Sequence, residues 1–394
     1  MAVFVAGTGA VCAAGNGVPV GFGALVKSEN YLKSFPHPDL TTTPMPLCAQ
    51  VECDLEILAG REGMYKTLAL ALVAADEAMA ALPEHGNLRL GVVAATTVGG
   101  ISQTEHAYKQ FRTDPAAITP LAIECAVHEP VVLSSELCRR FSAYGFHTVS
   151  TACSSSLHAI GMAKRMIERE YYDACLVVGA DALCITTVRG FGSLTLLDPN
   201  GCRPFDKTRA GISLGEGAGA MLLVGPQVLS RCPGGALAGI SGWGASSDCF
   251  HMTAPHPDGE GARSAIEGAL KEAQLPPEAI SAVISHGTGT PDNDKSEIAV
   301  LKSVFQKLPP FCSLKRVLGH TLAASGILEA VFAVTMLHEE YLPATAGFSE
   351  PDEEIGAIPF TGGTLSMRHI LKNAFGFGGN NATCIISRLE DDAS

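Results

Sequence analysis

One of the thirteen cysteines in this chain occupies a position suited to nucleophilic chemistry. Cys153 comes shortly after an apolar, β-branched run that ends at Val149, and a helical pattern begins at once after it. A thiol at the start of a helix lies at the positive end of the helix dipole, where unpaired backbone N–H groups stabilise a thiolate. We therefore expect Cys153 to be the nucleophile of an enzyme that works through a covalent intermediate.

Two histidines have surroundings that suit chemistry beside such a thiol. His286 follows an apolar strand and opens the turn His-Gly-Thr-Gly-Thr-Pro at 286–291. His320 begins a run of small residues with a helical pattern, five positions after Lys315. An imidazole at a helix N-terminus is biased towards its neutral form, because the dipole disfavours a positive charge there. Such histidines suit hydrogen-bond donation to a developing oxyanion.

A further segment, residues 373–381, interleaves phenylalanines with glycines. Glycines let the backbone approach a ligand closely, so that backbone amides can point into a site. Phe377 stands in the middle of this segment and could move as a plug. Each segment taken alone also fits an ordinary turn or a packed side chain. Their combination is what indicates catalysis.

With these segments the chain closely resembles the β-ketoacyl-acyl-carrier-protein synthases, the elongating condensing enzymes of the thiolase superfamily. Several separate motifs occur in the family's order: Thr-Ala-Cys-Ser-Ser-Ser at 151–156, Arg-Pro-Phe-Asp-Lys at 203–207, Gly-Glu-Gly-Ala-Gly at 215–219, Ser-Ser-Asp-Cys-Phe-His-Met-Thr at 246–253, the turn at 286–291, the segment 315–320 and Phe-Gly-Phe-Gly-Gly at 375–379. The resemblance is strong over residues 145–388 and weak over the first 140.

The resemblance implies a role for each of the chemically suited residues. Cys153 would take an acyl group from a phosphopantetheine thioester. His286 and His320 would help malonyl decarboxylation and stabilise the resulting enolate, and Lys315 would hold His320 in place electrostatically. The backbone amides of Cys153 and Phe377 would form an oxyanion hole, and the Phe377 ring would gate the site.

Seven more residues match family positions around the site. Four are implied in substrate binding: Thr288, Thr290, Thr253 and Phe375. The hydroxyls of Thr288 and Thr290 would bind the pantetheine arm. Three match the buried carboxylates that support the catalytic groups: Asp294, Glu297 and Glu329. The chain departs from the family at Asn380, where threonine is usual, and at Ile212, where an aromatic residue is common.

Short apolar strings alternate with longer helical patterns, which favours an α/β architecture with strands covered on both sides. The composition changes to Gly, Pro and polar residues at 226–235, and the order of elements then begins again. Each half opens with an apolar strand that ends in a Gly-containing turn, at 5–9 and at 240–244. The resemblance implies the thiolase fold, two pseudo-symmetric α/β halves at 1–228 and 229–394 in a five-layered αβαβα arrangement.

Composition excludes several other classes of protein. Hydrophobic residues make up 47% and charged residues 17%, which argues against disorder, and an acidic tail is expected only from Glu390. A formal net charge of −13 disfavours nucleic-acid binding. No apolar run approaches the roughly 20 residues of a membrane span. No signal peptide, C-x-x-C pair or metal-ligand spacing occurs, so we expect a reduced, cytoplasmic enzyme with no metal.

The expected reaction is decarboxylative condensation of an acyl chain on Cys153 with malonyl-acyl carrier protein. No tightly bound cofactor is expected, because the substrates arrive on the phosphopantetheine of the carrier. Lys207, Arg209 and Lys66 are candidates for docking this acidic partner. We expect a homodimer, and the alternative is a heterodimer with a related subunit in a polyketide or polyene pathway.

Three alternatives stay open at this stage. The chain could be a chain-length-factor-like subunit that shapes a partner's pocket, although such subunits usually lack the nucleophile. It could be a CoA-dependent thiolase or initiating synthase, but those relatives pair the cysteine with His–Cys or His–Asn, and Cys384 lies in an apolar strand. Fatty-acid and polyketide elongation are not distinguished by the motifs.

Overall fold

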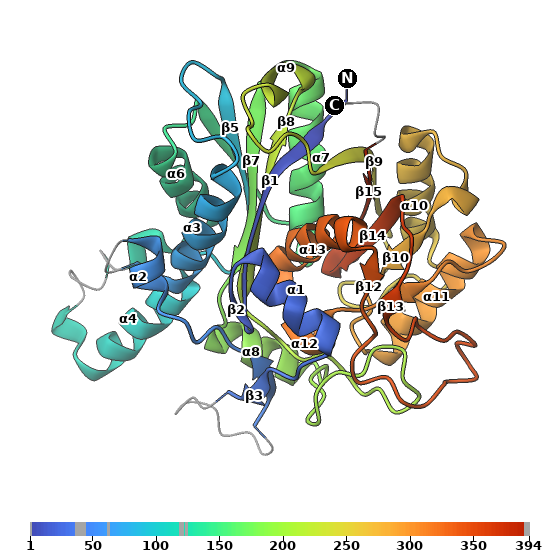
Figure 1. Cartoon of the computed structure of the whole chain (residues 1–394). Helices are drawn as coiled ribbons and strands as arrows, with labels where there is room; N and C mark the ends of the chain where they lie inside the picture. Colours follow the sequence, from blue (N-terminus) through green and yellow to red (C-terminus); the bar gives the residue numbers. More distant parts are fainter. Residues whose placement is uncertain (1, 36–44, 61–63, 118–121, 123–124, 390–394) are drawn as a thin grey trace.

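The structure is a computed structural model of the chain and describes residues 2–35, 45–60, 64–117, 122 and 125–389. The acidic tail predicted from Glu390 lies outside the described residues. Strands run through the middle of the molecule, and helices cover them on both sides and fill the space between two groups of strands (Figure 1). The architecture is mixed α/β, as the alternation of apolar and helical patterns predicts.

The first group of strands belongs to the N-terminal part of the chain. It consists of β1 (Phe4–Cys12), β8 (Gly217–Val224), β7 (Ala174–Asp181), β5 (Leu90–Ala95) and β6 (Gly145–Val149), in this spatial order. The β1–β8 and β8–β7 pairs are antiparallel, and the β7–β5 and β5–β6 pairs are parallel. A short strand, β2 (Gly15–Asn16), adds to β1.

The second group repeats this arrangement. Its spatial order is β9 (Ala238–Ser247), β15 (Asn380–Ser387), β14 (His369–Gly376), β10 (Ala282–Ile284) and β11 (Phe311–Cys312). Two antiparallel pairs are again followed by two parallel pairs. β1 and β9 meet antiparallel over two residue pairs and so join the groups into one sheet path. The shared topology indicates an internal duplication, and we propose the boundary between the halves at residues 228–229.

The helices form three layers around these strands. The central pair, α7 (Ser155–Glu168) and α13 (Ser325–Glu339), packs against strands of both groups. One outer layer holds α3 (Lys66–Met79) and α6 (Pro130–Arg140), and the other holds α10 (Glu260–Ala273) and α11 (Pro291–Val304) (Figure 1). Together with the strands this gives the five-layered thiolase arrangement. Contrary to our expectation, one helical stretch within the described residues, 322–339, is long and apolar enough to cross a membrane; 83% of it is buried inside this fold, as in a core helix.

The remaining elements connect or flank these layers. They are α1 (Val18–Lys27), α2 (Leu55–Ala59), α4 (Ile101–Thr113), α8 (Ile185–Ser193), α9 (Pro226–Leu229), α12 (Lys315–Leu318) and the small pairs β3 (Leu32–Ser34) with β4 (Leu47–Ala49) and β12 (Tyr341–Leu342) with β13 (Gly363–Thr364).

The glycines near the start of each half do not form the turns that we predicted. Gly7 and Gly9 lie inside β1, and Gly242 and Gly244 occupy the matching places inside β9. A Cβ atom on any of the four would come within 2.0–2.2 Å of a carbonyl oxygen of the outer helix, α3 or α10. The glycines therefore serve close helix-to-strand packing, and they do so in the same way in both halves.

Replacing Gly9 by alanine should destabilise the fold by more than the roughly 1–3 kcal/mol that is typical of overpacking. Its new Cβ would lie 2.0 Å from the backbone oxygen of Ala74, and a helix backbone has little room to move. The matched control is Gly239→Ala in β9, where the nearest heavy atom to the new Cβ is 3.6 Å away. Denaturant unfolding of both variants tests this, and equal midpoints would contradict it.

Candidate active site

Cys153 lies in the loop between β6 and α7, with 5% of its surface exposed. The preceding residue, Ala152, has a left-handed backbone conformation with φ 52°, which is unusual for a residue with a side chain. The predicted helix start at the cysteine is wrong by two residues, because α7 begins at Ser155. Ser155 Oγ ties the turn together, accepting from the Thr151 amide at 2.7 Å and donating to the Ala152 carbonyl at 2.6 Å.

Burial raises the pKa of the Cys153 thiol to about 11, so the sulfur is protonated at neutral pH. Burial thus outweighs the stabilisation of a thiolate that we expected from the start of a helix. Three opposing influences lower this pKa: the charge of Lys315 and the backbone amides of Phe377 and of Cys153 itself. The family resemblance implies these two amides as an oxyanion hole, and in the structure both lie at the sulfur.

The two histidine rings lie close together and nearly perpendicular. Their centroids are 5.5 Å apart with an interplanar angle of 84°. His320 Nδ1 accepts a hydrogen bond from the Leu322 amide at 3.3 Å, which places the proton of the neutral ring on Nε2. That Nε2 has no hydrogen-bond partner among the described residues, and neither has Nδ1 of His286. Each ring therefore keeps a buried polar nitrogen unused.

Both imidazoles are neutral. Burial, followed by the charge of Lys315, lowers the pKa of His286 well below its usual value and that of His320 to about 3. The neutral state agrees with our expectation, but the cause differs. His320 does not begin a helix, because α13 starts only at Ser325. Low solvent exposure and the nearby lysines, rather than a helix terminus, keep the His320 ring neutral.

A buried group of three charges lies near the histidines. Lys315 Nζ and Lys372 Nζ each lie 2.8 Å from an oxygen of Glu329, and all three side chains are at most 1% exposed. Ser325 Oγ also donates to Glu329, at 2.7 Å. Sequence reasoning identified Lys315 and Glu329 but missed Lys372. The available signal was a lysine that follows Ile370 and Leu371 just before the Phe-Gly-Phe-Gly-Gly segment.

The other two carboxylates support the turn that carries His286. Glu297 accepts hydrogen bonds from the amides of His286 and Gly287, both at 2.8 Å. Asp294 accepts from the Phe205 amide at 2.7 Å and from Gly289 at 3.2 Å. Both carboxylates hold backbone rather than substrate.

A second buried carboxylate network, missed from the sequence, surrounds Asp181 at the end of β7. Its oxygens accept from the amides of Thr97, Val98 and Ala323 and from the Thr96 hydroxyl. Because Ala323 follows His320 closely, Asp181 ties the N-terminal half to the histidine segment. Nothing in the local sequence distinguishes this aspartate from an ordinary strand end.

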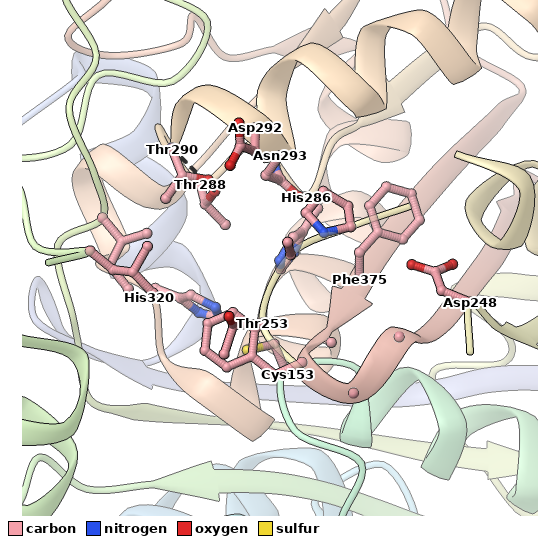
Figure 2. A pocket seen from close by; sticks show the side chains of 18 of the residues that line it. Cys153, Asp248, Thr253, His286, Thr288, Thr290, Asp292, Asn293, His320 and Phe375 are labelled. Atoms are coloured by element: carbon pink, nitrogen blue, oxygen red, sulfur yellow. Dashed lines mark hydrogen bonds between the residues drawn. The ribbon is translucent and has the colours of Figure 1, made fainter. Parts of the chain in front are cut away.

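Cys153 and both histidines open into one cavity of about 170 Å³. Figure 2 shows the three residues facing each other, with Thr288 and Thr290 on one side and Phe375 on another. The two threonine hydroxyls lie 2.9 Å apart. The cavity is lined by all four residues implied in substrate binding: Thr253, Thr288, Thr290 and Phe375. Phe377 and Ile212 line it as well.

A second cavity, of about 470 Å³, shares Cys153 with the first one. Its other lining residues are mostly apolar or small: Thr97, Val98, Ala152, Thr187, Gly190, Phe191, Ser193, Leu194, Leu322 and Phe377. The rings of Phe191 and Phe377 stack with centroids 5.5 Å apart, and both rings contribute to both cavities. Asn380 Nδ2 donates to the Phe377 carbonyl at 3.2 Å, so the residue that departs from the family helps to hold this loop.

The three residues proposed to dock a carrier do not form an open basic surface. Lys66 pairs with the buried Glu216 at 2.5 Å. The Arg209 side chain is 5% exposed and pairs with Asp352 at 2.5 Å. Lys207 is exposed, but it pairs with Glu350 at 2.7 Å. Burial argues against a docking role for Arg209, whereas docking by Lys207 and Lys66, whose side chains are 58% and 41% exposed, stays a prediction.

The variant Glu329→Gln should destabilise the protein by about 3–5 kcal/mol, because it leaves two buried lysines without their shared carboxylate. The lysines lower the pKa of Glu329 from 4.5 to about 2. Its contribution to stability is therefore complete above pH 4.5 and is lost as the pH falls towards 2. Chemical denaturation at pH 7 and at lower pH measures both effects.

The matched control is Glu354→Gln, which removes an exposed carboxylate 3.2 Å from Lys295. This variant should change stability by at most about 1 kcal/mol. Equal losses in the two variants would contradict the importance of the buried charges.

Two sequence profiles match the chain: "Beta-ketoacyl synthase, N-terminal domain" over residues 2–226 and "Beta-ketoacyl synthase, C-terminal domain" over 237–349. Proteins named 3-oxoacyl-[acyl-carrier-protein] synthase 2 from Coxiella burnetii and Vibrio harveyi are each 29% identical over 99% of both chains.

Solved structures agree with this assignment. The ishigamide ketosynthase/chain length factor superposes with a TM-score of 0.91 at 27% identity over 99% of both chains. A ketosynthase in complex with its chain length factor from Xenorhabdus doucetiae gives 0.84 at 30% identity over 98% of both chains. The profile matches, the full-length relatives and the shared fold lead to one conclusion: the chain belongs to the beta-ketoacyl synthase family.

Proposed function

We propose that this chain is an acyltransferase that catalyses decarboxylative Claisen condensation. An acyl group moves from a carrier thioester to Cys153, and malonyl-carrier protein then loses CO2 and attacks the acyl carbon. The product is a chain longer by two carbons. The observation that carries the proposal is one cavity that holds a buried thiol, two neutral imidazoles with unused nitrogens and two backbone amides at the sulfur.

Acyl transfer to Cys153 starts from a protonated thiol, so the sulfur must lose its proton as it attacks. A neutral imidazole of the same cavity is a suitable acceptor. The thioester oxygen becomes negative in the tetrahedral intermediate, and the amides of Cys153 and Phe377 are the donors placed to stabilise it. The leaving thiol of the carrier then takes up the proton.

Decarboxylation of the malonyl group produces an enolate. Neutral donors stabilise the enolate oxygen without protonating the carbon that must attack. His320 meets this need with its Nε2–H, and His286 contributes the second ring. The enolate carbon then attacks the acyl-Cys153 carbonyl, and the thiolate leaves as the carbon–sulfur bond breaks.

The two cavities suggest where each part of the substrates lies. We assign the pantetheine arm to the first cavity, where Thr288 and Thr290 offer hydroxyls, and the acyl chain to the apolar second cavity. Phe377 and Phe191 stand between them, so movement of the Phe377 loop would control passage from one to the other. The acyl carrier protein is the proposed partner, and no tightly bound cofactor enters the scheme.

We further propose that the chain works as a dimer in the cytoplasm, where thiols remain reduced. All thirteen cysteines are unpaired in the structure. β6 ends the sheet path and exposes Phe146 at 40% and its neighbour Tyr144 at 74%, which offers an unpaired strand edge. The alternative is a heterodimer with a related subunit, favoured by the similarity to ketosynthase and chain length factor complexes.

The variant Cys153→Ala should abolish condensation, because the acyl group has no nucleophile to receive it. The same variant should retain malonyl-carrier decarboxylation, since both histidines remain. Product analysis and CO2 release, together with mass spectrometry of acyl groups trapped on the protein, measure these outcomes. The control Cys175→Ala removes another fully buried thiol, in β7, and should change neither activity. Full condensation by Cys153→Ala would refute the proposal.

Size-exclusion chromatography with mass detection should give twice the 40.9 kDa of one chain for the homodimer. The substitution Phe146→Glu should reduce the mass to that of one chain, because it places a charge at the exposed end of the sheet. The control Ile358→Glu alters an exposed apolar residue away from β6 and should leave the mass unchanged. The heterodimer would be favoured if the unaltered protein alone has the mass of one chain and this mass doubles when a pathway partner is added.

A further inference from the structure

Lys372 is a fully buried lysine on β14 with three close polar neighbours. Its ammonium forms the ion pair with Glu329 at 2.8 Å. It also donates to the carbonyl oxygens of Ser285 at 3.3 Å and of Asn373 at 2.5 Å. The side chain therefore connects the charges beneath the site to the strand end that carries His286.

The peptide group between Ser285 and His286 is held at both of its ends. Its carbonyl oxygen accepts from Lys372, and its N–H donates to Glu297 at 2.8 Å. Asn373, the next residue along β14, donates to the same carboxylate oxygen of Glu297 at 3.2 Å. A cation at the oxygen and an anion at the N–H match the direction of the peptide dipole, which makes both hydrogen bonds charge-assisted.

The structural need for this lysine is small. Glu329 already has a cation, because Lys315 lies 2.8 Å from its other oxygen. A second buried ammonium adds a desolvation cost of several kcal/mol, and an apolar side chain of similar volume would avoid it. The extra cation also lies close enough to lower the pKa of both histidines. Its location thus favours a role in the site over a role in stability.

We propose that Lys372 is a positioning residue that holds His286 in place for malonyl decarboxylation, by fixing the Ser285–His286 peptide against Glu297 and Glu329. The inference rests on the proposed condensing function, since it concerns one of its two half-reactions. Acyl transfer uses Cys153, the two backbone amides and an imidazole only as the acceptor of the thiol proton, so it depends less on the exact position of His286 than decarboxylation does. Lys372 touches backbone and carboxylate and has no role as a donor to the substrate.

The test measures the two half-reactions separately in the variant Lys372→Met, which keeps the length of the side chain but removes donor and charge. Loss of alignment by about 1 Å can cost up to about 100-fold in rate. We expect kcat for malonyl-carrier decarboxylation to fall at least about tenfold, with KM and the rate of acyl transfer to Cys153 changed less than about twofold. A merely structural residue would reduce both half-reactions together or neither.

The matched control is Lys164→Met. Lys164 lies in α7 and is also buried, and it pairs at 2.5 Å with Glu168 of the same helix and with Glu272 of α10. It lines neither cavity. The Lys164→Met variant should leave the ratio of the two half-reaction rates unchanged, whether or not it lowers the stability of the protein. A wild-type ratio in Lys372→Met, or an equal fall of both half-reactions, overturns the proposal.

A second variant covers a failure of Lys372→Met to fold. Lys372→Gln keeps a polar end towards the Ser285 carbonyl, and we expect the same selective loss of decarboxylation with a smaller magnitude. If neither variant folds, Lys372 is a structural residue and the proposal is wrong. Decarboxylation by the unaltered protein is the control for the proposed function itself. If the unaltered protein does not decarboxylate malonyl-carrier protein at all, the proposed function is wrong; if it does and the variants show no selective loss, only the role of Lys372 is wrong.

Discussion

The ion pairs of Glu329 with Lys315 and Lys372 are the interaction on which the site depends. They place two lysines and one glutamate in a buried region, close enough to the two histidines to affect their charge state. Electrostatic effects are large in such surroundings, because solvent does not screen them. Burial has the largest effect in keeping the imidazoles neutral, and both lysines add to it. Lys315 also opposes the burial effect on the Cys153 thiol, and Lys372 fixes the backbone before His286. Catalytic geometry and protonation state are therefore coupled through the same buried lysines.

The duplicated fold explains how these groups meet. The N-terminal half supplies Cys153, while the C-terminal half supplies both histidines and the Phe377 loop. The contact between them is close because small side chains line it: Ser156 Oγ accepts the Ile327 amide at 2.9 Å, and a Cβ on Gly326 would lie 2.8 Å from that oxygen. The small-residue runs near the cysteine and after His320 thus set the distance between α7 and α13.

The sequence was sufficient for the local parts of this description. Strand and helix patterns gave the α/β class, and the motifs around Cys153, His286, His320 and Phe377 identified segments that the structure brings to one cavity. Properties that depend on contacts between distant segments were missed. The glycines of β1 and β9 were interpreted as turns, because the closeness of α3 and α10 is a tertiary feature.

Charged residues show the same limit. Lys372 is one of three polar residues in β14, with His369 and Asn373, and its partner Glu329 lies on a different element, 43 positions earlier in the chain. Arg209 reads as a surface cation because its sequence neighbours are polar, yet Asp352 neutralises it from far along the chain. A local pattern reports the type of a side chain and its neighbours, whereas burial and pairing are decided by the whole fold.

The protonation states of Cys153 and the histidines have a consequence for the order of events. Burial raises the pKa of the thiol to about 11 and lowers that of His320 to about 3, so the resting pair is a thiol and an imidazole, not a thiolate and an imidazolium. In the proposed mechanism, proton transfer becomes favourable when a thioester carbonyl brings its oxygen to the amides of Cys153 and Phe377, because these donors then stabilise the charge that forms. In the empty site the sulfur is therefore mainly in its thiol form. Reactivity in this design arises with the substrate, which suits a cysteine that must not be modified between turnovers.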